Sequence, residues 1–411
     1  MQGQMKSNWK KVKLSDICDV RDGTHDSPKR TAEGSFLITS KHIKGGKIDL
    51  SSAYKISVKD FDMVNRRSKV DQWDILLSMI GTIGEVCIVK EKPDFAIKNV
   101  GLIKTNDEIL SLYLYYYLKA PTAQSDIIAR LKGTTQQYLS LGEIRSFPIS
   151  IPQDDRVMRK ITKILSSIDD KIELNNKINR NLETQAQAIF KSWFIDFEPF
   201  KNGKFIDSEL GKIPEGWSID RLGSVCECVL GGTPSRSHKE YWEGNIPWIN
   251  SGKTNEFRVI SPSEFISDEA LKKSATKFLP KKTTILAITG ATLGKISLLE
   301  IDACANQSVV GILENDYLPY EYIYRYVSHN IEKITSHQTG GAQQHINKDN
   351  IKNFHIILPP KFELKRYKML VEHLYNEITT LVFQSRFLSQ LRDTLLPKLM
   401  SGEIDVSDIA V

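Results

Sequence analysis

The sequence predicts an α+β fold: two duplicated β-rich mixed globular domains, separated by a pair of long antiparallel coiled-coil helices and related by a pseudo-twofold axis. The first observation behind this prediction is a set of motifs that return at a nearly constant offset. Trp9 returns as Trp217 (217 − 9 = 208), and Gln137 returns as Gln344 (344 − 137 = 207). The second observation is that each copy is followed by a long segment with helical spacing of its apolar residues.

The repeated motifs fall at three places in each copy, while the stretches between them differ freely. This pattern is typical of one scaffold that carries two different specificities. The motif pairs are Trp9…Leu14…Gly23-Thr24 with Trp217…Leu222…Gly232-Thr233, Asp74–Gly84 with Thr284–Gly294, and Gly133–Gln137 with Gly340–Gln344.

Short β-prone runs separated by glycines and charged turns predict the strands of the first copy, at about 36–39, 75–79, 86–89 and 147–151. A helix is expected from about Asp107 to Leu118, with Asn106 as its N-cap, and its copy from about Pro319 to His329. The tyrosines of both helices recur at helical spacing. We therefore expect them to be core residues rather than platforms on which bases stack.

Two long helices are predicted at about 154–195 and 361–400. The first segment contains no glycine or proline, and its apolar residues alternate at intervals of three and four. Each helix has a narrow apolar seam, so the economical arrangement is that the two helices pack against each other. Asn175 and Ser385 are polar positions in this seam, of the kind that fix the register of a coiled coil.

The chain is expected to divide into four regions. These are a first domain (1–152), a first long helix with its connector (153–215), a second domain (216–359), and a second long helix with the C-terminal tail (360–411). The connector is rich in Gly, Pro and charged residues, as in Gly211-Lys-Ile-Pro-Glu-Gly-Trp217.

Composition indicates a soluble globular protein with room for a core in each half. The formal net charge is +6, which is compatible with a polyanionic partner but weak evidence alone. No apolar stretch is long enough to span a bilayer, and the first residues lack the apolar core of a secretory signal. Five sparse cysteines fit buried, reduced thiols better than metal ligands. We expect a cytoplasmic protein without a metal site.

No motif of an enzyme active site or of a cofactor site is recognisable. Gly290-Ala-Thr-Leu-Gly294-Lys295 is one residue short of a phosphate-binding P-loop and is followed by Ile instead of Ser or Thr. Its copy has Glu85 in place of the lysine. We therefore expect a chain that catalyses nothing and binds no cofactor itself.

The duplicated loops are instead suited to holding nucleic acid. Loops of small residues allow backbone N–H groups to approach phosphates, and glutamine amides can pair with adenine. The alternative is that these are only the turns of a duplicated fold. The candidate DNA contacts are Ser40, Lys41, His42, Ser78, Thr82, Gln136 and Gln137 in the first copy, and Ser251, Lys253, Thr289, Thr292, Gln343, Gln344 and His345 in the second.

The long helices carry more apolar residues than a two-helix seam can cover. Clusters of this size usually mark a protein interface, and we expect Phe190, Trp193, Phe194, Phe387, Leu396 and Leu399 to bind a partner. The alternative is that these side chains fold back onto the two domains.

Taken together, these features resemble the specificity subunit of type I restriction-modification enzymes, over nearly the whole chain. The motifs that carry the resemblance are Gly211–Trp217, Gly231-Gly-Thr-Pro-Ser235 with Tyr241-Trp242, the Gly81/Gly84 loop, and the Gln-Gln turns. The first copy departs from this pattern at Gly23–Pro28 and lacks the Tyr-Trp pair.

The resemblance implies a non-catalytic subunit in which each domain, a target recognition domain, reads one half of a bipartite double-stranded DNA target. It implies that the helices set the spacing and bind two copies of a DNA methyltransferase subunit, with restriction or translocase subunits as further partners. S-adenosylmethionine, ATP and Mg are then expected on those partner subunits. Two other functions remain open: a self-contained nuclease-methyltransferase, and a structural clamp without sequence-specific DNA binding.

Overall fold

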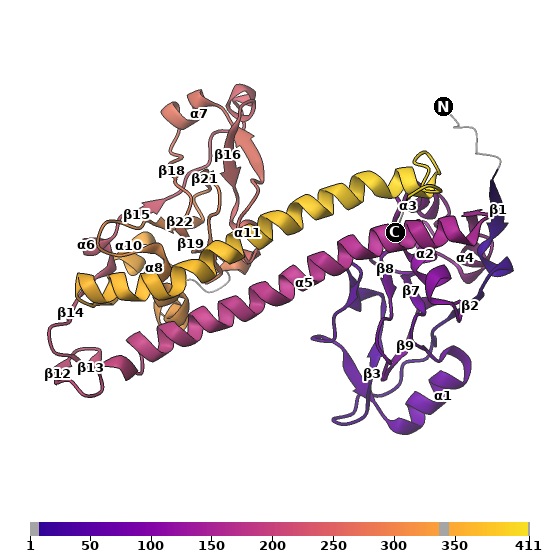
Figure 1. Cartoon of the computed structure of the whole chain (residues 1–411), viewed down its shortest axis with the longest axis horizontal. Coiled ribbons are helices and arrows are strands. Elements are labelled where there is room, and N and C mark those ends of the chain that lie inside the picture. Colours follow the sequence, from indigo (N-terminus) through magenta and orange to yellow (C-terminus); the bar gives the residue numbers. More distant parts are fainter. Residues whose placement is uncertain (1–7, 337–344, 410–411) are drawn as a thin grey trace. The chain divides into compact units, whose positions relative to one another are not determined.

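The structure is a computed structural model that describes residues 8–336 and 345–409. It divides into two compact units. Unit 1 contains the residues up to Ile172 and from Phe387 onward, and unit 2 is Glu173–Arg386. Each unit combines one β-rich domain with part of each of two long helices, α5 (Asp155–Phe194) and α11 (Lys361–Met400) (Figure 1).

Unit 1 contains a four-stranded antiparallel sheet in the order β2-β10-β7-β8 and a three-stranded sheet in the order β6-β3-β9, in which β3 and β9 are parallel. Strand β1 pairs with β11 and so joins the start of the domain to its end. The strands are β1 (Trp9–Lys13), β2 (Asp19–Asp22), β3 (Ser35–Ile38), β4 (Ile43–Lys44), β5 (Lys47–Ile48), β6 (Tyr54–Ile56), β7 (Ile75–Ser78), β8 (Val86–Ile88), β9 (Phe95–Ile97), β10 (Val100–Lys104) and β11 (Pro148–Pro152).

Unit 2 repeats this strand order and adds one strand, β18, to the second sheet. Its sheets run β15-β22-β19-β20 and β17-β16-β21-β18, with β16 and β21 parallel, and β14 pairs with β23. The strands are β12 (Phe205–Ser208), β13 (Gly211–Pro214), β14 (Ser218–Arg221), β15 (Cys228–Leu230), β16 (Ile246–Ile249), β17 (Glu264–Ile266), β18 (Phe278–Leu279), β19 (Thr284–Ala287), β20 (Ile296–Leu298), β21 (Ala303–Ala305), β22 (Val309–Ile312) and β23 (His355–Leu358). The predicted duplication of a mixed, β-rich domain is confirmed.

Short helices connect these strands in both units. The α-helices are α1 (Val58–Ser68), α2 (Glu108–Lys119), α3 (Pro121–Ala129), α4 (Leu141–Arg145), α6 (Leu222–Val225), α7 (Asp268–Lys273), α8 (Tyr320–His329), α9 (Ile331–Thr335) and α10 (Lys348–Lys352), and the 3-10 turns are η1 (Leu14–Asp16), η2 (Ser40–His42), η3 (Glu198–Phe200), η4 (Lys239–Trp242), η5 (Ser251–Asn255) and η6 (Gly290–Thr292).

Helix α2 is present as predicted, but its N-cap is Asp107, whose carboxylate accepts a hydrogen bond from the backbone N–H of Leu110 at 3.0 Å. The prediction of Asn106 as the cap was wrong, because Asn106 has a φ of 55° and forms the left-handed turn that precedes the helix.

The tyrosines of α2 and α8 are core residues, as predicted. The Oη of Tyr113 donates to the carbonyl of Ser150 at 2.6 Å, and that of Tyr322 donates to the carbonyl of Ile357 at 2.7 Å. The two copies therefore share even the hydrogen bond by which this helix is fixed to the last strand of the domain.

Helices α5 and α11 pack side by side in opposite directions within each unit, which confirms their predicted pairing (Figure 1). In unit 1 the Nη1 of Arg392 lies 2.7 Å from the Oδ1 of Asp169. In unit 2 the Nδ2 of Asn175 donates to the Oγ of Ser385 at 3.2 Å, while the rings of Phe194 and Tyr367 lie 4.8 Å apart. The two polar seam positions named from the sequence thus contact each other.

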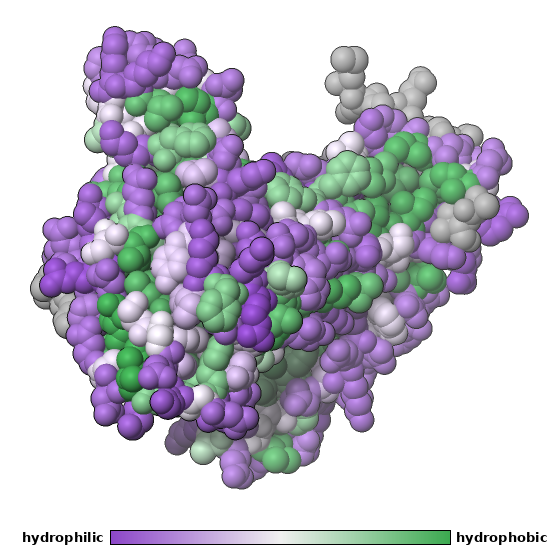
Figure 2. Space-filling model, turned by 60° about the vertical axis from the view of Figure 1, so that its left-hand side comes forward, coloured by the Kyte–Doolittle hydropathy of each residue, from purple (hydrophilic) through white to green (hydrophobic). Residues whose placement is uncertain are grey.

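The surface in the view of Figure 2 is mainly hydrophilic, with separate apolar patches. Among the residues that the structure describes, no helix is both long and apolar enough to cross a membrane.

Candidate nucleic-acid interface

Four segments of unit 1 meet around the tight turn Lys98-Asn99, which joins β9 to β10. The backbone N–H of Thr24 donates to the carbonyl of Ile97 at 3.1 Å, so the loop after β2 lies against this turn. The Oγ of Ser40 donates to the carbonyl of Asn99 at 3.1 Å and brings in η2.

The other two segments join through Met79. Its N–H donates to the Oγ of Ser40 at 3.3 Å, and its carbonyl accepts from the N–H of Leu139 at 2.9 Å. The small-residue loop 78–84 and the turn 133–138 therefore lie beside η2. Three loops that the sequence singled out separately form one continuous surface.

Unit 2 builds the same arrangement around residues 306–308, between β21 and β22. Gly232 N–H donates to the carbonyl of Ala305 at 2.8 Å, and Asn306 N–H donates to the carbonyl of Ile249 at 3.0 Å. Ile288 N–H donates to the carbonyl of Ser308 at 2.9 Å, and the carbonyl of Ile288 accepts from Ile346 N–H at 3.0 Å. The loops of the second copy thus converge in the same way.

Three of the candidates in unit 1 are buried and hold the loops together, so they do not lie on this surface. Ser40, His42 and Ser78 are at most 6% exposed. The Oγ of Ser78 accepts from Glu85 N–H at 2.8 Å and donates to the carbonyl of Thr82, which closes the loop 78–84. The prediction that these three side chains contact DNA was wrong. Backbone groups of tight loops need hydrogen-bond partners, and these polar side chains supply them.

His42 shows the same structural role. Its Nδ1 accepts a hydrogen bond from Thr39 N–H at 2.9 Å. Burial and the neighbouring Lys41 lower the pKa of His42, so its ring is neutral at pH 7. A neutral, buried imidazole attracts no phosphate.

The remaining candidates of unit 1 are exposed. Lys41 and Thr82 stand beside each other, because the Oγ1 of Thr82 donates to the carbonyl of Ser40 at 3.3 Å. Gln136 and Gln137 lie at the exposed tip of the neighbouring turn. A cation and two amides are therefore available on one surface, while the hydroxyl proton of Thr82 is used within the loops.

The candidates of unit 2 are less uniform. Three of them are half-buried, namely Ser251, Thr289 and Thr292. His345 is exposed and pairs with Thr289 in an isolated antiparallel β-bridge. The Nζ of Lys253 is engaged by the carboxylate of Glu256 at 2.7 Å and by the Oγ of Ser261 at 3.1 Å. Gln343 and Gln344 lie outside the described residues.

Sequence reasoning missed the residues of the central turn itself. His25 contacts the Oδ1 of Asn99 through its Nδ1 at 2.8 Å, and in unit 2 the exposed Gln307 accepts a hydrogen bond from Thr233. A signal was present, because Asn99 and Asn306 are related by the same offset as the other motifs (306 − 99 = 207).

Cys226 and Cys228 are buried thiols and do not act as reactive groups at this surface. Burial raises the pKa of Cys226 to about 12 and that of Cys228 to about 11, which keeps both thiols protonated at pH 7. No group of three or more His, Cys, Asp or Glu side chains able to hold a metal occurs within the described ranges.

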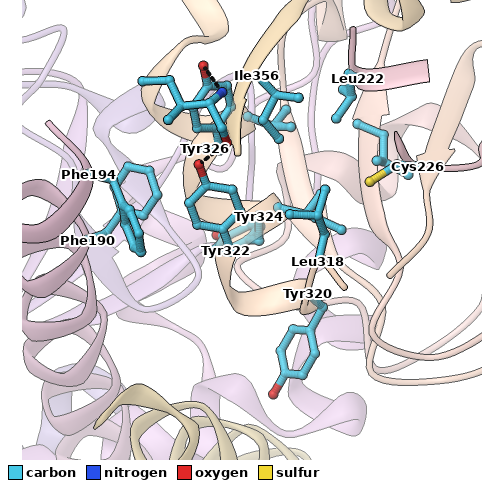
Figure 3. Close-up of a cluster of buried hydrophobic side chains, with 14 of the residues drawn as sticks. Phe190, Phe194, Leu222, Cys226, Leu318, Tyr320, Tyr322, Tyr324, Tyr326 and Ile356 are labelled. Carbon is cyan, nitrogen blue, oxygen red and sulfur yellow. Dashed lines mark hydrogen bonds between the residues drawn. The ribbon is translucent and has the colours of Figure 1, made fainter. Parts of the chain in front are cut away.

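The expected partner-binding cluster on the long helices is not exposed. Phe190, Trp193 and Phe194 are at most 8% exposed, and Phe194 packs edge-on against Tyr322 with ring centroids 4.7 Å apart (Figure 3). Leu396 and Leu399 are buried in the core of unit 1. The prediction was wrong for these five residues, because the side chains fold back onto the domains. Phe387 alone of the six is exposed, at 65%.

Comparison with known proteins shows which protein family has this architecture. The family model described as the type I restriction modification DNA specificity domain matches residues 6–184 and again 214–380. The type I restriction enzyme MjaIX specificity subunit of Methanocaldococcus jannaschii is 27% identical, over 99% of this chain and 96% of that protein. The HindI specificity subunit of Haemophilus influenzae is 24% identical, over 71% of this chain and 77% of that protein.

A solved structure has the same fold. The type I restriction-modification system S subunit from M. genitalium matches with a TM-score of 0.59 at 18% identity, and the match covers 97% of both chains. With two matches to the family model that together span most of the sequence, the chain belongs to the family of type I restriction-modification DNA specificity domains and contains two such domains.

Proposed function

We propose that this chain is the DNA sequence-specificity subunit of a type I restriction-modification complex, in which each domain reads one half of a bipartite target. The observation that carries the proposal is the four-segment surface that occurs once in each unit with different exposed side chains. Lys41, Gln136 and Gln137 mark it in unit 1, and Gln307 and His345 mark it in unit 2.

Such a surface suits DNA for physical reasons. Lysine neutralises phosphates without regard to sequence, whereas amides such as those of Gln136 and Gln137 can distinguish bases by their donor and acceptor pattern. Two copies of one scaffold with different side chains give two different readings of the same duplex. The names of the relatives, which are specificity subunits, support this assignment.

The chemistry of methylation and cleavage is assigned to other subunits. We propose that this chain is non-catalytic and that two methyltransferase subunits, with or without restriction or translocase subunits, assemble on it. S-adenosylmethionine, ATP and Mg would then be bound by those partners. The paired helices would set the distance between the two half-sites, since readers on one face of B-DNA need a separation related to the helical turn, ~34 Å.

The test is an exchange of one domain. Residues 216–358 are replaced by the corresponding region of a relative, and methylated bases are mapped in the DNA of a host that expresses the chain with its methyltransferase partner. Only one half of the methylated sequence is expected to change. The reciprocal exchange of residues 9–152 is the matched control and should change only the other half.

Changes in both halves from a single exchange would contradict separate reading by the two domains. Methylation without any sequence preference would instead favour a structural clamp.

A further inference from the structure

The second domain is joined to both long helices by a network of buried and half-buried charges. Arg258 follows the loop η5 closely in the sequence, and its side chain has no exposed surface. Its Nη2 donates to the carboxylate of Glu183 on α5 at 2.8 Å, and its Nη1 donates to the Oη of Tyr324 on α8 at 3.2 Å.

The same carboxylate receives a second arginine. The Nη2 of Arg325 on α8 lies 2.7 Å from the Oε1 of Glu183, and its Nε donates to the Oη of Tyr375 on α11 at 3.0 Å. Glu183 therefore connects the segment after η5, a domain helix and both long helices. Although burial alone would raise the pKa of Glu183, Arg258 and Arg325 hold it below its ordinary value, so the carboxylate is ionised at pH 7.

A further pair of contacts attaches the same region to α11. The Nζ of Lys282 lies 2.6 Å from the Oε2 of Glu300 and donates to the Oγ1 of Thr379 at 2.8 Å. Directional bonds thus anchor the domain at two points around Arg258.

Unit 1 has a simpler junction. When Tyr113 is matched with Tyr322, Tyr116 falls at the position of Arg325 (325 − 116 = 209), and its Oη donates to the Oδ2 of Asp169 at 3.0 Å. Arg392 on α11 reaches the other oxygen of this carboxylate at 2.7 Å. In both units an acidic residue of α5 is the acceptor at the junction between domain and helix pair.

Such networks are weak arguments for stability. Removing charges from water costs several kcal/mol per ion, and well-packed apolar residues of similar volume often stabilise a protein as well or better. Burial of apolar surface is, however, non-directional, so a domain held by apolar packing alone can tilt or slide on a helix. A set of hydrogen bonds with defined geometry permits one orientation only.

We propose that Glu183, Arg258 and Arg325 are positioning residues that fix the angle of the second domain on the helix pair and so restrict the complex to one gap length between the two half-sites. This inference rests on the proposed function, because a gap length has meaning only for a bipartite DNA target. Bases in the half-sites are read by the loops, and the junction controls where the loops are held.

The test replaces the three proposed positioning residues by apolar ones, in the triple variant Glu183→Leu, Arg258→Met, Arg325→Met, and keeps the ion pair of Lys282 with Glu300. No buried charge of this triad is then left unpaired, so the chain is expected to fold. Methylated sites are mapped in a host that expresses the full chain and its methyltransferase partner. We expect unchanged half-site sequences and at least a tenfold rise in methylation of sites whose gap is one base pair longer or shorter.

Two further variants make the result specific. Arg258→Lys keeps the charge but loses the planar fork that spans Glu183 and Tyr324. It should raise methylation at sites with a longer or shorter gap, but by less than the triple variant does. If the triple variant does not fold, this substitution alone decides the question. The matched control is Glu269→Gln with Lys273→Gln, an exposed pair 2.7 Å apart on α7 of the same unit, which should leave the gap unchanged.

A folded triple variant that keeps the single gap of the unaltered chain would overturn the inference. So would a variant whose half-site bases change while the gap does not. If the unaltered chain itself shows no half-site preference, the proposed function fails, and this outcome is distinct from failure of the junction variants.

Discussion

Individual polar residues in this protein divide between those that hold loops together and those that face solvent, and the sequence did not separate the two groups. Ser40, Ser78 and Thr82 all follow strands, and this position predicts a DNA contact for each of them. Only Thr82 is exposed. The difference is set by the hydrogen-bond needs of nearby backbone groups, which depend on tertiary contacts such as that between Met79 and Ser40.

One buried residue gives a prediction about pH. Glu321 on α8 has no exposed surface, and burial, its largest influence, raises its pKa from 4.5 to about 7. Because the folded-state pKa is raised, the folded chain binds more protons than the unfolded chain between pH 4.5 and 7, and stability falls as pH rises through this window. Above pH 7 the full cost, about 3 kcal/mol at ~1.4 kcal/mol per pKa unit, is present.

Glu321→Gln removes the ionisable group. The variant should therefore have a higher free energy of unfolding than the unaltered chain at pH 8, and the two should differ little at pH 4.5. Denaturant unfolding at a series of pH values measures this. Glu332→Gln, at an exposed carboxylate on α9, is the control. An equal pH dependence in the chain with and without Glu321→Gln would contradict the assignment.

At the scale of elements, the long helices were the most predictable part of the chain. Their apolar spacing, sustained over about forty residues, gave ends that agree with Asp155–Phe194 and Lys361–Met400 to within one residue. What the spacing could not give is the identity of the neighbour. Phe190, Trp193 and Phe194 occupy one face of α5, and only the fold shows that the second domain covers this face.

The turn that follows α11 has a backbone conformation that favours glycine. Gly402 has a φ of 71°, and a Cβ added there would lie 2.7 Å from the Nε1 of Trp9 at the start of the chain. Gly402→Ala should therefore cost the strain of a left-handed residue, about 1–2 kcal/mol, plus the displacement of the indole.

Gly216→Ala is the matched comparison, because Gly216 also has a positive φ, of 87°, but has nothing within 4 Å of the added carbon. Thermal unfolding with tryptophan fluorescence measures both effects. A loss of stability no larger for Gly402→Ala than for Gly216→Ala would mean that the contact with Trp9 is unimportant.

At the scale of the whole molecule, duplication explains why the chain contains two equivalent surfaces, but the exposed apolar side chains of the long helices are not duplicated. Most of them lie on α11, where Phe362, Met369 and Phe387 are 63%, 70% and 65% exposed, whereas α5 has Leu174 at 50%. The positions in α5 that correspond to Phe362 and Phe387 are Asp155 and Arg180 (362 − 207 = 155, 387 − 207 = 180). An interface on duplicated surfaces and an interface on α11 alone therefore predict different assemblies.

We expect two copies of the methyltransferase partner per chain, since each unit presents the same arrangement of sheets and helix ends and an equivalent surface binds an equivalent partner. Native mass measurement of the purified complex tests this ratio. The double variant Phe362→Glu, Met369→Glu serves as the discriminating control, because charging α11 should leave the 2:1 ratio intact if the duplicated surfaces bind the partner. A 1:1 complex that this variant abolishes would show instead that the partner docks on α11, and that the duplication serves DNA reading only.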